Sequence, residues 1–229
     1  MVLEDDDVPS QTFFPFCKEM LDRYENDERI TMITGINYQE ITDYCPDDYF
    51  FSDDIAIWGW ATWKRVVDRW DGKYSFLDDD YSMMLMKNYL DFHKERNGFI
   101  NSMKVHRASG IPYYETILAA NHFFSNGLSI VPKRNMINNV GMTANSTHFN
   151  GNIKSLPKSY RHIFTMKRFE LDFPLKHPKY VINNVQYHKD INKILARNSV
   201  LRQRWRQLQT LLLRICYGDF KSIFRAITK

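Results

Sequence analysis

Four consecutive acids at residues 4–7 directly follow a short apolar segment, residues 1–3 (Met-Val-Leu). A strand that ends in such a run delivers alternate carboxylates, here Glu4 and Asp6, to one side of the chain. Hard divalent cations need several oxygen ligands at one point, so the arrangement is typical of a metal site at a strand end. A solvated acidic surface is the alternative interpretation of the same run. Other segments of the sequence are needed to distinguish a metal site from a solvated acidic surface.

The remaining sequence mixes strand and helix patterns, which indicates an α/β protein. Runs rich in β-branched or aromatic residues predict strands at residues 29–34, 49–52 and 128–132. Recurring apolar residues predict helices at residues 11–25, 61–70, 80–96, 112–126 and 188–215. We expect residues 133–188 to be mostly loop. A nucleotide-binding α/β domain normally places several strand–helix units before its first catalytic carboxylates, whereas only three residues precede Glu4.

The composition indicates the size of the core and the cellular compartment of the protein. The chain has 229 residues, of which 44% are hydrophobic, enough for one well-buried core. Its three cysteines are far apart and indicate neither a zinc site nor a disulfide framework, so a reducing compartment fits best. Acids close to Met1 argue against a signal peptide, and no apolar run approaches the roughly 20 residues that span a bilayer. We therefore expect a cytoplasmic protein.

The charge is unevenly distributed along the chain. Residues 189–229 hold ten of the 31 basic and two of the 27 acidic side chains, a net of +8, so the rest carries −4. We therefore divide the chain into a body, residues 1–187, and a basic helical tail, residues 188–229. No motif for nucleic-acid recognition accompanies this charge.

The predicted tail helix is amphipathic. One apolar stripe recurs at spacings of three and four residues: Leu201, Trp205, Leu208, Leu212 and Ile215. Four arginines surround it: Arg202, Arg204, Arg206 and Arg214. A basic amphipathic helix with a tryptophan suits a membrane surface, and we predict peripheral contact with the inner membrane there. Packing of the stripe on the body or on a partner is the alternative.

Three tryptophans fall within six residues, at Trp58, Trp60 and Trp63. Indole faces can stack on a sugar acceptor, and their N–H groups need polar partners. Lys64 and Arg65 follow directly and are candidates for holding diphosphate oxygens. The alternative is a buried aromatic cluster that opens a helix, with two ordinary surface cations.

Several segments resemble one family. The chain is similar to bacterial glycosyltransferases of the GT-A fold, the nucleotide-diphospho-sugar transferases, and to the Glu-Asp-Asp segment of the eukaryotic N-acetylglucosaminyltransferase that initiates complex N-glycans. The resemblance covers about residues 1–185, and the Trp-Gly-Trp-Ala-Thr-Trp-Lys-Arg run is its most specific part. It is carried by residues 2–17, 29–37, 50–65, 126–148 and 173–178.

The resemblance implies a site for Mn²⁺ or Mg²⁺. Asp6 is then the direct metal ligand, and Glu4 and Asp5 contact metal-bound water or the nucleotide ribose. His148, after Thr147, stands where relatives have a His near the phosphates, as a second metal ligand or a phosphate donor. A loop histidine bonded to backbone is the alternative there. Asp7 has a lower weight, because many relatives carry an uncharged residue at that position.

The catalytic base is less clearly matched. The family's suspected base is an Asp in a Trp-Asp-Tyr segment, and this chain has Tyr114-Glu115-Thr116. Glu115 keeps the carboxylate but adds a methylene, and a displacement of that size can cost about 10²-fold in rate. A surface Glu in a first helical turn is the alternative. Acids at residues 78–80 are a second source of a base, although a helix cap explains them better.

The expected function is transfer of a sugar from a nucleotide-diphosphate donor to a glycan or lipid-linked acceptor, with inversion, in bacterial surface-polysaccharide synthesis. The expected architecture is the C-terminal part of a GT-A fold, with its N-terminal nucleotide-binding half missing. The competing hypothesis is a catalytically silent fragment or an acceptor- or metal-binding subunit. A partner chain would then carry the nucleotide-binding half, and this chain alone would bind nucleotide sugars weakly or not at all.

Overall fold

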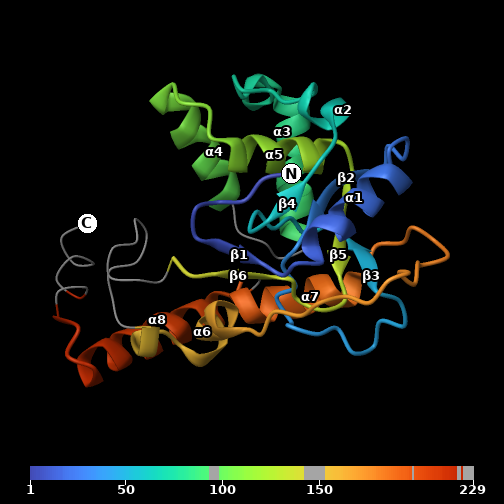
Figure 1. Cartoon of the computed structure of the whole chain (residues 1–229). Coiled ribbons are helices and arrows are strands. Elements are labelled where there is room, and N and C mark those ends of the chain that lie inside the picture. Colours follow the sequence, from blue (N-terminus) through green and yellow to red (C-terminus); the bar gives the residue numbers. More distant parts are fainter. Residues whose placement is uncertain (93–97, 142–152, 198, 221–222, 224–229) are drawn as a thin grey trace.

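The computed structural model describes residues 1–92, 98–141, 153–197, 199–220 and 223. It confirms a mixed α/β protein. Helices lie on opposite sides of a central four-stranded sheet, and a two-stranded ribbon lies beside it (Figure 1). The strand order of the sheet is β3-β5-β2-β4.

The central sheet is mixed in direction. Strand β2 (Ile30–Thr34) pairs in parallel with β5 (Leu128–Pro132), while β3 (Tyr49–Ser52) is antiparallel to β5 and β4 (Trp60–Ala61) is antiparallel to β2. Every residue of β2, β3 and β4 is buried, because helices and loops cover both faces of the sheet. The strands predicted at residues 29–34, 49–52 and 128–132 are therefore confirmed.

The acids lie in a turn between two small β elements. Val2 forms an isolated antiparallel bridge with Trp60. Strand β1 (Asp7–Pro9) begins only at the last acid and pairs with β6 (Ile137–Asn139). The strand expected at residues 1–3 is thus reduced to a single bridge. The turn closes on itself through a hydrogen bond from the Asp7 amide to the Glu4 carbonyl, 3.2 Å long.

Two groups of helices flank the sheet (Figure 1). The first group comprises α2 (Lys64–Val67), the 3-10 helix η1 (Ser75–Asp78), α3 (Asp80–Phe92), α4 (Gly98–Ser109) and α5 (Tyr114–Phe124). All of these except α2 share a separate apolar core, whereas Val66 of α2 packs in the core around the sheet. The second comprises η2 (Ile153–Ser155), α6 (Lys158–Thr165), α7 (Val185–Leu195) and α8 (Val200–Cys216). Helix α1 (Phe13–Arg23) packs its buried face, including Phe13, Phe16 and Met20, against the sheet.

The prediction of one helix over residues 188–215 is wrong. The chain leaves the helical conformation at Ala196, whose φ is +54°, and restarts at α8. Tyr187 and Ile191 of α7 are buried in the core, so α7 packs with the body and the expected boundary after residue 187 falls inside it. Helices α4 and α6 were not predicted either. None of the described helices is both long and apolar enough to cross a membrane.

Candidate functional site

Asp7 fixes the shape of the acidic turn. Its Oδ2 accepts hydrogen bonds from the amides of Gly59, at 2.8 Å, and Glu4, at 3.2 Å. Gly59 has a φ of +59°, and a Cβ there would lie 2.4 Å from a side-chain carbon of Ile137, so only glycine fits. Burial raises the pKa of Asp7, and the two amide bonds act in the opposite direction. Asp7, given little weight from the sequence, is thus a structural member of the site.

Asp6 is positioned by the ribbon. Its carbonyl accepts from the Val140 amide at 2.8 Å, and its Oδ1 accepts from Nδ2 of Asn139 at 2.7 Å. Gly141 lies so close that a Cβ there would be 1.9 Å from Oδ2 of Asp6. Residues on β6 and just beyond it therefore hold the carboxylate that the resemblance makes the metal ligand.

Glu4 is joined to the first turn of α5. The hydroxyl of Tyr114 donates to Oε1 of Glu4 over 2.6 Å. The ring of Tyr114 is stacked on that of Trp60, with centroids 6.1 Å apart and planes at 15°. Burial, the bond to Glu4 and nearby negative charges raise the pKa of the Tyr114 hydroxyl, which therefore stays protonated and able to donate. No sequence pattern could have shown this contact, because it joins residues 110 positions apart.

Glu115 follows Tyr114 in the same turn. The negative charges of Glu4, Glu115 and Asp7 all contribute to the raised pKa of Tyr114. Its Oε2 is buried and has no hydrogen-bond partner in the part of the chain that the structure describes. A buried carboxylate oxygen without a donor is uncommon and is suited to accepting a proton or a hydrogen bond from a bound molecule.

The acidic turn fits a hard cation. Glu4, Asp6 and Asp7 each offer one carboxylate oxygen, and these oxygens lie within 4.8 Å of one another. Among the described residues, Oε2 of Glu4 and Oδ2 of Asp6 accept no hydrogen bond, so both are available as ligands. A donor set of oxygens alone suits Mg²⁺ or Mn²⁺ better than softer metals.

The predicted diphosphate-binding cations are elsewhere. The guanidinium of Arg65 lies 4.6 Å from the ring centre of Trp63 and donates to backbone carbonyls between Tyr24 and Ile30, ahead of and at the start of β2. Lys64 is highly exposed and pairs with Asp68. Both cations therefore stabilise local structure, and neither meets the acids.

The three tryptophans divide between different surroundings. Trp63 is buried in the core, where its Nε1 donates to the Leu21 carbonyl. Trp60 is buried behind Tyr114 at the acidic turn. Trp58 is half-buried and packs near Phe164 of α6. Only Trp58 thus keeps part of its surface accessible to a ligand.

The other residues predicted for the site are Asp5, His148 and the acids at residues 78–80. Asp5 is the exposed member of the acidic turn. His148 lies outside the described residues. The acids at residues 78–80 serve local structure, since Asp79 accepts from the Ser82 amide and hydroxyl, and Asp78 pairs with Arg107.

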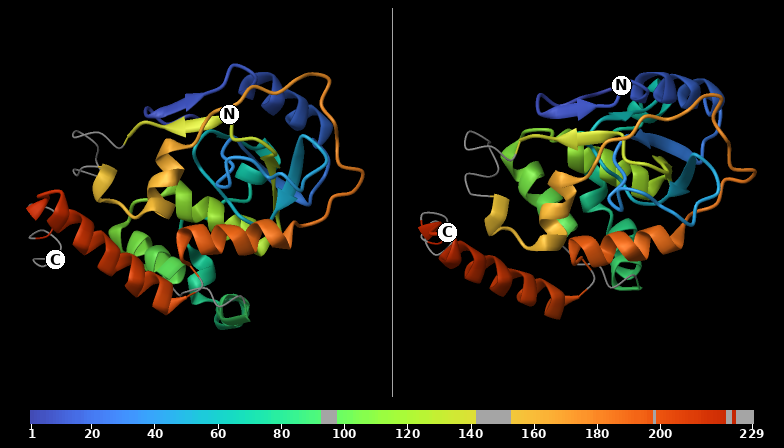
Figure 2. Two further views of the ribbon diagram at one scale, coloured as in Figure 1. Left: turned by 90° about the horizontal axis from the view of Figure 1, so that it is seen from below. Right: turned by 60° about the horizontal axis from the view of Figure 1, so that its bottom comes forward.

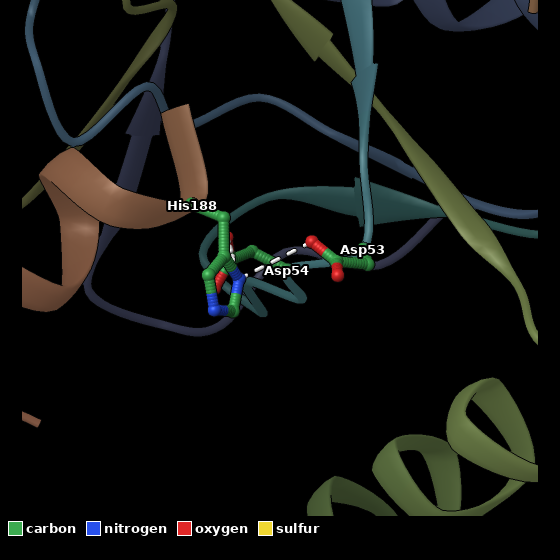
Figure 3. A group of neighbouring side chains, drawn as sticks. All are labelled: Asp53, Asp54 and His188. Carbon is green, nitrogen blue, oxygen red and sulfur yellow. Dashed lines mark hydrogen bonds and ion pairs between the residues drawn. The ribbon is translucent and has the colours of Figure 1, made fainter. Parts of the chain in front are cut away.

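A second group of possible metal ligands lies where β3 leads into Asp53 and Asp54 and α7 carries His188 (Figure 3). Nδ1 of His188 lies 3.2 Å from Asp53 and 3.1 Å from Asp54, and its Nε2 accepts from the Asn192 amide at 2.9 Å. Nδ1 therefore carries the ring proton, and Arg197 adds a positive charge 3.4 Å from Asp54. The carboxylates already have cationic or donor partners, so we interpret this group as a joint between β3 and α7.

This joint makes stability depend on pH. Burial raises the pKa of Asp53, but His188, Asn183 and Tyr89 outweigh burial and hold it at about 2, below its usual 3.8. A depressed carboxyl pKa stabilises the fold above the unfolded value and loses that contribution as the pH falls toward 2. The shift corresponds to about 2 kcal/mol.

We therefore expect Asp53→Asn to lower the free energy of unfolding at pH 6 and to lose less stability than the wild type between pH 4 and pH 2. Urea unfolding of both proteins across that range measures the difference. Asp5→Asn, which removes an exposed carboxylate, is the control. Parallel pH profiles for Asp53→Asn and the wild type would contradict the assignment.

Comparisons with protein-family models, with curated proteins and with solved structures found no match to this chain.

Proposed function

We propose that this chain carries the metal- and acceptor-side chemistry of a GT-A-like sugar transfer from a nucleotide-diphosphate donor to a hydroxyl acceptor. One observation carries the proposal: the hydrogen bond between Tyr114 and Glu4 brings the acidic turn and the helix turn bearing Glu115 together. The resemblance assigns metal binding to the acidic turn and proton abstraction to Glu115. These two features come from distant parts of the sequence.

Each residue has a role in this proposal. When bound by Asp6 and Glu4, a divalent ion supplies positive charge for the diphosphate leaving group. Tyr114 holds Glu4 in place, and Asp7 fixes the turn. Glu115 accepts the proton of the acceptor hydroxyl while the oxygen of that hydroxyl forms its bond to the anomeric carbon of the donor sugar. The bond from that carbon to the diphosphate oxygen breaks on the opposite side, which inverts the configuration.

The position of the predicted cations favours a second candidate. Arg65 bonds to backbone carbonyls and Lys64 pairs with Asp68, so neither is available beside the acids to hold a diphosphate. The chain is then a metal- and acceptor-binding subunit, and the nucleotide is held by a partner chain. The two candidates share the acidic turn and differ in whether the donor binds to this chain alone.

Titration of the purified chain separates the candidates. Mn²⁺ binding is followed by its electron paramagnetic resonance signal, and UDP- and GDP-sugars are then added in a calorimeter. Mn²⁺ binding with micromolar, metal-dependent donor binding supports the self-sufficient enzyme. Mn²⁺ binding with donor affinity weaker than millimolar supports the subunit. Absence of Mn²⁺ binding at millimolar concentration contradicts both.

A further inference from the structure

Helix α8 presents an apolar surface away from the body. None of its 17 residues is buried. The exposed fractions are 81% for Leu201, 60% for Trp205 and 51% for Leu212. The helix runs along the outside of the molecule in both views of Figure 2. Large apolar side chains at this exposure are costly in water unless another surface covers them.

The other side of α8 is attached to the body. Arg206 donates to the Leu195 carbonyl at 2.6 Å, and its guanidinium lies 5.4 Å from the ring centre of Tyr160. Gln203, Thr210 and Leu213 are half-buried. These residues lie on the side of the helix opposite Leu201 and Trp205, given about 100° of rotation per residue. The body thus holds the helix with its apolar stripe facing outward.

Charge identifies the surface that fits this stripe. With the same rotation, Arg202 and Arg204 fall on the two borders of the stripe, and both are exposed. The sequence of α8 contains four arginines and no Asp or Glu. Arginines bordering an apolar face with a central tryptophan match the headgroup level of an anionic bilayer.

A second copy of the chain fits less well. Pairing of two α8 helices through the stripe would bring Arg202 and Arg204 of both copies together without a carboxylate from either helix. Like charges at such an interface oppose association. A bilayer of anionic lipids has the opposite charge and the apolar interior that this face needs.

We propose that α8 binds in the plane of an anionic membrane surface, with Leu201, Trp205 and Leu212 inserted at the acyl boundary. This contact does not depend on the proposed sugar transfer.

The test is sedimentation of the purified chain with vesicles of phosphatidylcholine alone or with 30% phosphatidylglycerol. We expect binding to the anionic vesicles, at least tenfold weaker binding for Arg202→Gln/Arg204→Gln, and a similar loss for Trp205→Ala. Lys18→Gln/Lys64→Gln removes two highly exposed body cations and is the matched control, expected to retain binding. Circular dichroism checks that each variant is folded.

Three outcomes would overturn the proposal. One is that the wild type fails to bind anionic vesicles. Another is that the two double variants lose affinity equally, since general charge attraction would then explain binding. The third is a concentration-dependent dimer, abolished by Trp205→Ala, without vesicle binding, which would assign the stripe to a second copy.

Discussion

Glu115→Gln is expected to lower the rate of sugar transfer by about 10²- to 10⁴-fold, the usual contribution of a general base. The substitution keeps the length and shape of the side chain but removes the group that takes the acceptor proton. Metal affinity should change little, because the Tyr114–Glu4 contact remains. The measurement is kcat for release of nucleoside diphosphate in the presence of acceptor, with any partner chain supplied, beside an Mn²⁺ titration.

Two further variants sharpen this prediction. Glu25→Gln changes an exposed glutamate far along the chain and should retain the wild-type rate. Glu115→Asp restores the carboxylate length found in the resembled family. A site adapted to glutamate will lose activity in this variant, whereas a site impaired by the longer arm will gain it. A Glu115→Gln enzyme with unchanged kcat would remove Glu115 from the chemistry.

Local patterns predicted those parts of the fold whose structure is decided locally. The strands at residues 29–34 and 128–132 are short β-branched runs, and the helix at residues 11–25 has an apolar side that the core buries. The break at Ala196 has no glycine or proline to mark it. Helix α4 has a weak apolar pattern, and α6 lies among polar residues expected to form a loop. Tertiary packing determines where α7 ends and whether α4 and α6 form, and these contacts are hard to predict from a single sequence.

In the candidate site, too, some features could be predicted from the sequence and others depend on tertiary packing. The sequence marked the acidic turn and Glu115 as separate features, and in the structure Tyr114, the residue before Glu115, bonds to Glu4 of that turn. Nothing in the sequence indicated that Tyr114 contacts Glu4, since a contact over 110 positions leaves no local pattern. Arg65 shows the opposite error: its type suits a diphosphate, but its position allows bonds to carbonyls before β2. Residue type indicates what a side chain can bind, and only packing decides what it does bind.

Asp6→Asn is expected to weaken Mn²⁺ binding by at least about tenfold, through loss of one negative charge and of a good oxygen ligand. The amide keeps the shape of the carboxylate, and its oxygen can still accept the hydrogen bond from Asn139. The free energy of unfolding should therefore change by less than about 1 kcal/mol. Electron paramagnetic resonance of free Mn²⁺ gives the affinity, and urea unfolding gives the stability.

Its two neighbours provide matched comparisons. Asp5→Asn removes the same charge from the exposed position of the turn, so equal weakening by both variants would assign metal binding to general electrostatics instead of ligation. Asp7→Ala should act on stability instead, costing about 1–3 kcal/mol, because the amides of Gly59 and Glu4 lose their acceptor. If Asp6 is the ligand and Asp7 the support, affinity and stability will separate between these two adjacent carboxylates. Among the three aspartates of the run, Asp6 would then bind the metal, Asp7 would hold the turn and Asp5 would do neither.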